Sequence, residues 1–265
     1  MSRIETKFQL LKDQGKTALI TYVMSFDPDY ESSLKIIKEL PENGADIIEL
    51  GMAFSDPMAD GPDIQAAAVR ALKQGATVQG TIDLVKEFRK DDDTTPIILM
   101  GYYNPVFHYG VENFIDNAVE AGIDGVIIVD LTPEEEEEFI SKIESNELSH
   151  IKLTAPTTTK ARGEVVLKNA SGFIYYISVA GITGSKSADI TDAERKISQL
   201  REISDLPIAI GFGIKNAEQA KQFSEVADGI VIGSAFVKKI AENLDDKERA
   251  IEEVLNKVKE ISKAL

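Results

Sequence analysis

The sequence contains no cysteine and no tryptophan, and it has only two histidines among its 265 residues. Without cysteine the chain can form neither disulfide bonds nor a thiolate-ligated metal site. The histidines, His108 and His150, lie far apart in the sequence and match neither a metal-site spacing nor a catalytic triad, so no metal is expected. Residues 1–7 also lack the basic and then apolar plan of a signal peptide, and we therefore expect a cytoplasmic protein.

Positive charge is scarce as well. The chain has 29 Lys and Arg against 45 Asp and Glu, which gives a formal net charge of −16. A nucleic-acid-binding protein needs a basic surface, and no apolar run is long enough to span a bilayer, so neither nucleic acid nor a membrane is an expected partner. An anionic phosphate would meet a repulsive overall field. Such a ligand would have to be bound by local backbone N–H groups and helix ends.

Strand-like and helix-like segments alternate along the chain about eight times. Strands are expected over residues 18–24, 45–49, 96–100, 125–129, 150–153, 173–177, 207–210 and 229–232. Helices are expected over residues 4–12, 32–40, 64–74, 111–121, 162–169, 193–203 and 234–265. Two further helices are expected, one that begins at Pro133 and one that ends near Ser224. This pattern predicts an α/β fold, a single (β/α)8 TIM barrel domain over residues 1–265 with a short N-terminal helix. A doubly wound dinucleotide fold is disfavoured, because Gly211 and Gly213 follow the seventh strand and have no third glycine at the required spacing.

Residues 49–62 contain two carboxylates, Glu49 and Asp60, that are candidates for catalysis. Side chains alternate along a strand, so Glu49 shares a face with Ile47 in a segment whose two faces are both apolar. A buried carboxylate has a raised pKa and is costly, which favours a functional site over a strand-end Glu that reaches water. Asp60 lies in the turn sequence Asp60-Gly61-Pro62, where aspartate is common for local reasons. Its pairing with Glu49 nevertheless suggests two carboxylates that divide acid and base work.

The loops after the strands of such a barrel meet at one mouth, where active sites lie. Residues expected there are Glu49, Asp60, Asp130, Tyr175, Thr183 and the segment Gly211-Phe212-Gly213. The loops after the seventh and eighth strands contain Gly213, Gly233 and Ser234, which together predict a phosphate site at the start of the last helix. One tyrosine of each adjacent pair, Tyr102 and Tyr103 or Tyr175 and Tyr176, is expected to point to the barrel interior, where an aromatic substrate could stack, although strand preference alone would also explain them. The run Glu134–Glu138 is interpreted as solvated charge without a function.

Residues 49–65 closely resemble the signature of the tryptophan synthase alpha chain family. Residues 100–107, 180–184, 211–214 and 233–235 resemble further motifs of that family, in the family's order, so the resemblance covers nearly the whole chain. It implies a lyase that cleaves indole-3-glycerol phosphate by a retro-aldol reaction into indole and glyceraldehyde 3-phosphate, in the last steps of L-tryptophan biosynthesis.

The resemblance also implies roles for individual residues. Glu49 would be the principal acid and base, and Asp60 would contact the indole N–H. Backbone groups of Gly184, Gly213, Gly233 and Ser234 would bind the phosphate. The remaining candidate substrate-binding residues are Tyr22, which matches an aromatic position beside the indole, and Tyr102, Tyr175, Thr183 and Phe212. The chain itself would use no cofactor. Pyridoxal phosphate would belong to the beta chain, the implied partner in an α2β2 heterotetramer, with the loops at residues 54–60 and 179–187 acting as lids.

The sequence departs from the family pattern in two places, and three other interpretations stay open. Val179 stands where some members carry arginine, and residues 157–163 match only loosely. The chain could be a stand-alone lyase that releases free indole, or a largely inactive regulatory or binding subunit, although the latter has no need of Glu49. It could also be another phosphate-binding barrel enzyme, such as an isomerase of the same pathway, which would leave residues 49–60 unexplained.

Overall fold

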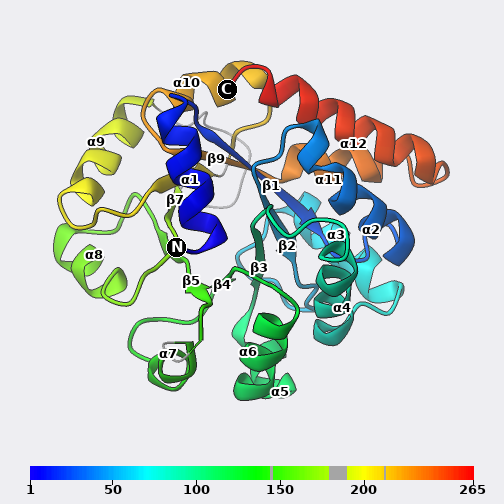
Figure 1. Ribbon diagram of the computed structural model, residues 1–265, viewed down its shortest axis with the longest axis horizontal. Coiled ribbons are helices and arrows are strands. Elements are labelled where there is room, and N and C mark those ends of the chain that lie inside the picture. Colours follow the sequence, from blue (N-terminus) through cyan, green and yellow to red (C-terminus); the bar gives the residue numbers. More distant parts are fainter. Residues whose placement is uncertain (144–145, 179–189, 212) are drawn as a thin grey trace.

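A computed structural model describes residues 1–143, 146–178, 190–211 and 213–265. Within these residues, nine parallel strands form one sheet with the order β5-β4-β3-β2-β1-β9-β8-β7-β6 (Figure 1). The strands are β1 (Ala18–Met24), β2 (Ile47–Gly51), β3 (Ile97–Gly101), β4 (Gly125–Ile128), β5 (Ser149–His150), β6 (Lys152–Thr154), β7 (Ile174–Ile177), β8 (Ile208–Gly211) and β9 (Gly229–Ile232). Their residues are almost all buried, as expected for a parallel sheet that is covered on both faces.

The sheet closes on itself through a strand that is split in two. β5 and β6 stand at the two ends of the sheet order, yet only Ile151 separates them in the sequence. β5 pairs with β4, and β6 pairs with β7. The two short strands are therefore halves of the fifth strand of an eight-stranded ring, which confirms the predicted TIM barrel.

The interior of the barrel is closed at its amino-terminal end by α1 (Arg3–Asp13). Ile4, Phe8 and Leu11 on one face of this helix pack with inward-facing strand residues, and the rings of Phe8 and Phe173 lie 5.6 Å apart between their centroids. A capping box between Ser2 and Glu5 begins the helix. Since this end is filled with apolar side chains, the opposite end of the barrel is left for the polar residues that follow the strands.

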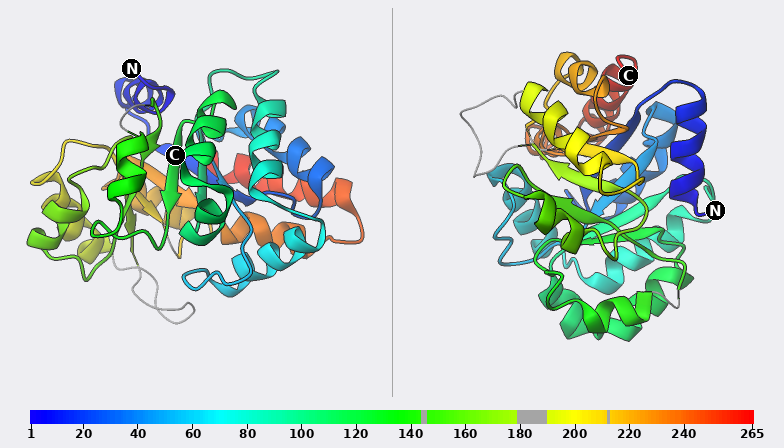
Figure 2. Two further views of the ribbon diagram at one scale, coloured as in Figure 1. Left: turned by 90° about the horizontal axis from the view of Figure 1, so that it is seen from below. Right: turned by 90° about the vertical axis from the view of Figure 1, so that its left-hand side faces the viewer.

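The remaining helices surround the strands (Figures 1 and 2). They are α2 (Tyr30–Glu39), the short 3-10 helix η1 (Pro41–Asn43), α3 (Pro62–Lys73), α4 (Val78–Phe88), α5 (Tyr103–Tyr109), α6 (Val111–Glu120), α7 (Glu137–Ile143), α8 (Lys160–Val166), α9 (Ile190–Arg201), α10 (Ala217–Ser224), α11 (Ser234–Ala241) and α12 (Lys247–Ser262). A continuous layer of Ile, Leu, Val, Ala and Phe side chains fills the space between helices and strands. Among the described residues, no helix combines the length and the apolar character needed to cross a membrane.

Several sequence predictions need correction. The predicted helix over 234–265 is two helices, because α11 ends at Ala241 and Asp246 caps a new helix, α12. Helices α4 and α5 were not predicted, and α7 begins at Glu137 rather than near residue 133. The interpretation of Glu134–Glu138 as solvated charge is wrong for Glu136, which is buried and paired with buried Lys152. The Nδ2 group of Asn169 donates to the same carboxylate at 3.0 Å.

Candidate active site

Glu49 lies on the inner face of the barrel. It is the register partner of Tyr22 across β1 and β2, and the inward-facing Ile47 precedes it by two residues on the same strand. Ile48 and Leu50 belong instead to the layer beneath the helices, so the predicted alternation of faces is confirmed. Only 1% of Glu49 is exposed, and its Oε2 atom has no hydrogen-bond partner among the described residues. A buried carboxylate oxygen without a partner is an available proton donor or acceptor.

Burial controls the ionisation of Glu49. Desolvation raises the pKa of its carboxyl group to about 8, and the nearby charge of Asp60 acts in the same direction. Near neutral pH the side chain therefore exists largely in the protonated form, but it can be deprotonated at a small cost. This is the property that proton transfer in both directions requires.

Asp60 lies on the loop between β2 and α3, and Tyr102 binds it. Burial raises the pKa of the Asp60 carboxyl to about 6, while a hydrogen bond from the Tyr102 side chain opposes that rise. The Tyr102 hydroxyl also accepts a hydrogen bond from the backbone N–H of Ala59 at 3.0 Å, and its ring packs 5.6 Å from that of Phe54. Because its pKa is lower than that of Glu49, Asp60 is ionised under conditions in which Glu49 keeps its proton.

Two tyrosines complete the interior of the site, and each of them lies against a glycine. A Cβ atom on Gly51 would lie 2.3 Å from the Tyr22 hydroxyl oxygen, and a Cβ atom on Gly211 would lie 2.3 Å from that of Tyr175. Burial is the largest cause of the raised pKa of Tyr22 and of Tyr175, and the charges of Glu49 and Asp60 raise both values further. All four side chains are therefore close enough to interact electrostatically. Sequence reasoning missed the purpose of Gly51, although its position two residues after Glu49, on the same face of β2, was a usable signal.

The candidate phosphate site follows β8 and β9. Gly213 has a φ of 90°, a conformation that favours glycine. Gly233 precedes the first turn of α11 without a side-chain cap, and Ser234 is the first residue of that helix. The first N–H groups of a helix have no partner within the helix, so this turn can offer donors to an anion. The other predicted residues of this part, Thr183, Gly184 and Phe212, lie outside the described residues, as does Val179.

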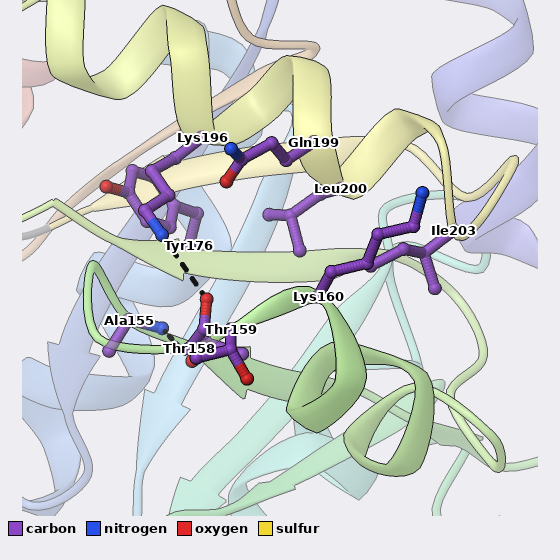
Figure 3. A pocket seen from close by; sticks show the side chains of 9 residues that line it. All are labelled: Ala155, Thr158, Thr159, Lys160, Tyr176, Lys196, Gln199, Leu200 and Ile203. Atoms are coloured by element: carbon purple, nitrogen blue, oxygen red, sulfur yellow. Dashed lines mark hydrogen bonds between the residues drawn. The ribbon is translucent and has the colours of Figure 1, made fainter.

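A small cavity elsewhere in the fold contains none of the predicted site residues. It lies between α8 and α9, has a volume of about 10 Å³ and is bordered by residues such as Thr158, Tyr176 and Lys196 (Figure 3). Lys196 donates to the backbone oxygen of Thr158 at 3.3 Å, and the space is sufficient for about one water molecule. In the described part of the chain, no three His, Asp or Glu side chains are arranged to hold a metal ion.

The fold and the site can be compared with known proteins. A family model described as the tryptophan synthase alpha chain matches residues 8–265. The chain belongs to this family. Alpha chains of tryptophan synthase cleave indole-3-glycerol phosphate in tryptophan biosynthesis, and this lyase reaction is the activity of the chain.

Solved structures of tryptophan synthase match over most or all of the chain. The chain is 37% identical to tryptophan synthase subunit alpha from Legionella pneumophila str. Paris, with a TM-score of 0.92 and coverage of 100% of this chain and 98% of that one. It is 30% identical to a chain of tryptophan synthase from M. tuberculosis in an aminoacrylate-bound form, with a TM-score of 0.89 and coverage of 100% and 99%. A chain of the α2β2 complex from the hyperthermophile Pyrococcus furiosus is 38% identical, with a TM-score of 0.83 and coverage of 92% and 97%.

Proposed function

We propose that Glu49 and Asp60 carry out the cleavage of indole-3-glycerol phosphate in this alpha chain. The observation that carries the proposal is the buried Glu49 carboxyl, whose Oε2 atom has no hydrogen-bond partner among the described residues and whose pKa is raised to about 8. Leaving a carboxyl group buried in this way destabilises the fold, so the position is best explained by proton transfer.

The reaction needs two proton movements and the cleavage of one carbon–carbon bond. Protonation of ring atom C3 makes the indole ring an electron acceptor. The hydroxyl on the glycerol carbon bound to the ring then loses its proton and becomes the aldehyde of glyceraldehyde 3-phosphate, and the electrons of the broken bond restore the aromatic ring. Glu49 gives the first proton and takes the second, so that it ends the cycle in its starting state.

Asp60 stabilises the charge that develops during this reaction. When C3 gains a proton, positive charge develops at the indole nitrogen, and an ionised carboxylate beside that nitrogen lowers the energy of the transition state. Asp60 has the lower pKa of the two carboxyl groups, about 6 against about 8, which suits this assignment. Tyr22, Tyr102 and Tyr175 would border the indole ring in this arrangement.

The phosphate would be bound at the start of α11. Backbone groups of Gly184, Gly213, Gly233 and Ser234 are the proposed donors. Gly184 lies outside the described residues, as do Thr183 and Phe212, which remain proposed substrate-binding residues. The net charge of −16 repels a phosphate at long range, but the N-terminus of a helix attracts an anion locally, so binding at this turn is favourable.

The proposed partner is a tryptophan synthase beta chain in an α2β2 complex. Met58, on the loop after β2, and Phe107, on α5, are exposed by 78% and 63%, and both segments follow the carboxyl ends of strands. Large exposed apolar side chains around the mouth support protein contact there.

Pyridoxal phosphate would belong to the beta chain, with no cofactor in the alpha chain. We also propose that the protein acts in the cytoplasm and that residues 1–265 form a single domain.

The test is to measure indole release from indole-3-glycerol phosphate by the wild type, by Asp60→Asn and by Asp63→Asn. Asp63 is exposed in the first turn of α3, so its variant is a matched control for the loss of one charge nearby. We expect Asp60→Asn to lose most of the activity while Asp63→Asn retains it. Equal activity of all three proteins would refute the role of Asp60, and an inactive wild type would refute the proposed function.

A further inference from the structure

The first turn of α5 is capped by a residue from a different strand loop. The Oδ1 atom of Asp130, just beyond β4, accepts a hydrogen bond from the backbone N–H of Tyr103 at 2.7 Å. Tyr103 is the first residue of α5, and the residue that precedes it, Tyr102, makes no side-chain capping bond. A helix of seven residues is too short to be stable by itself, so Asp130 provides the cap that the local sequence lacks.

The residue that precedes this cap is the one that binds Asp60. Tyr102 is 3% exposed and accepts from the N–H of Ala59, the residue before Asp60, at 3.0 Å, and hydrogen bonding by its side chain opposes the rise in the pKa of the Asp60 carboxyl. The backbone of Tyr102 lies directly before the first residue of α5, so a shift of that turn would also move the residue that carries the hydroxyl. The Tyr102 side chain therefore connects the capped turn directly to one of the two proposed catalytic carboxylates.

Asp130 is itself held on both sides. Before it, the N–H of Val129 donates to the backbone oxygen of Gly101 at 2.9 Å, which joins the ends of β4 and β3. After it, Glu136 forms a buried ion pair with Lys152 of β6 and accepts from Asn169 at 3.0 Å. The segment that carries Asp130 is thus attached to three neighbouring parts of the barrel, and the exposed Asp130 carboxylate itself is held by its hydrogen bond from the Tyr103 N–H.

We propose that Asp130 is a positioning residue for the cleavage reaction. Its carboxylate fixes the first turn of α5 and thereby places the Tyr102 hydroxyl on Asp60 and on the Ala59 N–H. The inference rests on the proposed roles of Asp60 and Glu49 and adds a residue that does not touch the substrate.

The experiment compares Asp130→Ala, which removes the acceptor, with Asp130→Asn, which keeps an oxygen that can accept from Tyr103 N–H. Glu135→Ala serves as the control, because it removes a negative charge from an exposed residue of the same segment. With full-length protein and a beta chain present, kcat for indole release should fall on the order of ten-fold in Asp130→Ala, with KM changed by less than about two-fold. Asp130→Asn and Glu135→Ala should remain near the wild type.

A second variant distinguishes action through Tyr102 from a general loss of structure. In a Tyr102→Phe background, Asp130→Ala should cause little further loss, because the hydroxyl that it positions is already absent. Full additivity of the two losses, or Asp130→Asn as inactive as Asp130→Ala, would overturn the proposal.

A readout that does not depend on turnover is the pKa of Asp60, measured from the ¹³C chemical shift of its carboxyl carbon. The Tyr102 hydrogen bond lowers this pKa, so Asp130→Ala and Tyr102→Phe should both raise it, while Asp130→Asn should not. An unchanged pKa of Asp60 in Asp130→Ala would overturn the inference whether or not the wild type cleaves the substrate. An inactive wild type with the expected pKa shift would refute only the proposed function.

Discussion

Tyr22 and Glu49 are register partners on the parallel strands β1 and β2, and they bring a phenol and a carboxyl group side by side into the barrel interior. Burial raises the pKa of Tyr22 most, and the charges of Asp60 and Glu49 raise it further. The Tyr22 phenol therefore stays neutral beside the two acids. A neutral hydroxyl next to Glu49 leaves the two carboxyl groups as the titrating members of the site.

The pH dependence of the reaction should therefore be bell-shaped. Asp60 must be ionised, which requires a pH above about 6, and Glu49 must begin protonated, which requires a pH below about 8. We expect kcat/KM for indole release to rise through the first value and to fall through the second. Asp60→Asn should lose the acidic limb in its residual activity. A profile that is flat from pH 5 to pH 9 in the wild type would contradict the assignment.

Glu49 should also lower the stability of the fold as the pH rises. Its folded pKa of about 8 lies above the ordinary value of 4.5, so the folded state binds the proton more tightly than the unfolded state does. The resulting loss of stability begins near pH 4.5, grows to about 3 kcal/mol at pH 7 and levels off above pH 8. Urea unfolding of Glu49→Gln should show a gain over the wild type that increases across this range. A gain that is the same at pH 5 and pH 8 would speak against the raised pKa.

The contact between Tyr175 and Gly211 should make residue 211 sensitive to even a methyl group. In Gly211→Ala, the new Cβ atom would lie 2.3 Å from the Tyr175 hydroxyl oxygen, and the buried ring has little room to move. We expect a large loss of indole release in Gly211→Ala, measured at saturating substrate. The ring atoms Cζ and Cε1 would still lie 2.7 and 2.8 Å from that Cβ atom, so removal of the hydroxyl in the double variant Gly211→Ala/Tyr175→Phe relieves the closest contact alone and should restore a small part of that loss relative to Gly211→Ala. If the double variant is worse than both single variants, the steric explanation is wrong.

A buried ion pair ties α3 to the loop after β1. Arg70 donates from Nε to Asp27 Oδ1 at 2.7 Å and from a second nitrogen to Oδ2 at 2.8 Å, and the Asp27 side chain is fully buried. Arg70→Leu would leave that carboxylate without its main partner, at a cost of about 3–5 kcal/mol in the free energy of unfolding. Lys86→Ala removes one partner of the exposed pair Lys86–Glu120 and should cost about 0–1 kcal/mol. Equal urea midpoints for the two variants would contradict this difference.

The parts of the structure that follow local patterns could be predicted from the sequence. The alternation of strands and helices predicted the barrel, and the two-residue period of a strand predicted that Glu49 faces inward with Ile47. The loop carboxylate Asp60 was singled out by its pairing with Glu49; burial raises the pKa of both residues, and their roles in the reaction stay predictions.

Some of the errors concern features that depend on distant residues. Helix α5 contains Pro105 and is capped by Asp130, which lies 27 residues beyond Tyr103, so its local sequence gave little indication of a helix. The run Glu134–Glu138 was interpreted as solvated charge because Lys152, the partner of Glu136, lies 16 residues later on β6 and cannot be seen in the local sequence. The break before α12 was locally visible, since Asp246 accepts from the Arg249 N–H as a helix cap, but the apolar pattern on either side suggested one helix.

The most direct test of the account is indole release from indole-3-glycerol phosphate by the wild type and by Glu49→Gln, each with and without a cognate beta chain. Glutamine keeps the shape of the side chain but cannot transfer a proton, and general acid–base groups typically contribute about 10²–10⁴-fold to a rate. We predict that the wild type forms indole, that the beta chain raises the rate, and that Glu49→Gln loses activity by about this factor in both conditions. A Glu49→Gln variant that retains wild-type turnover would contradict the central role of Glu49.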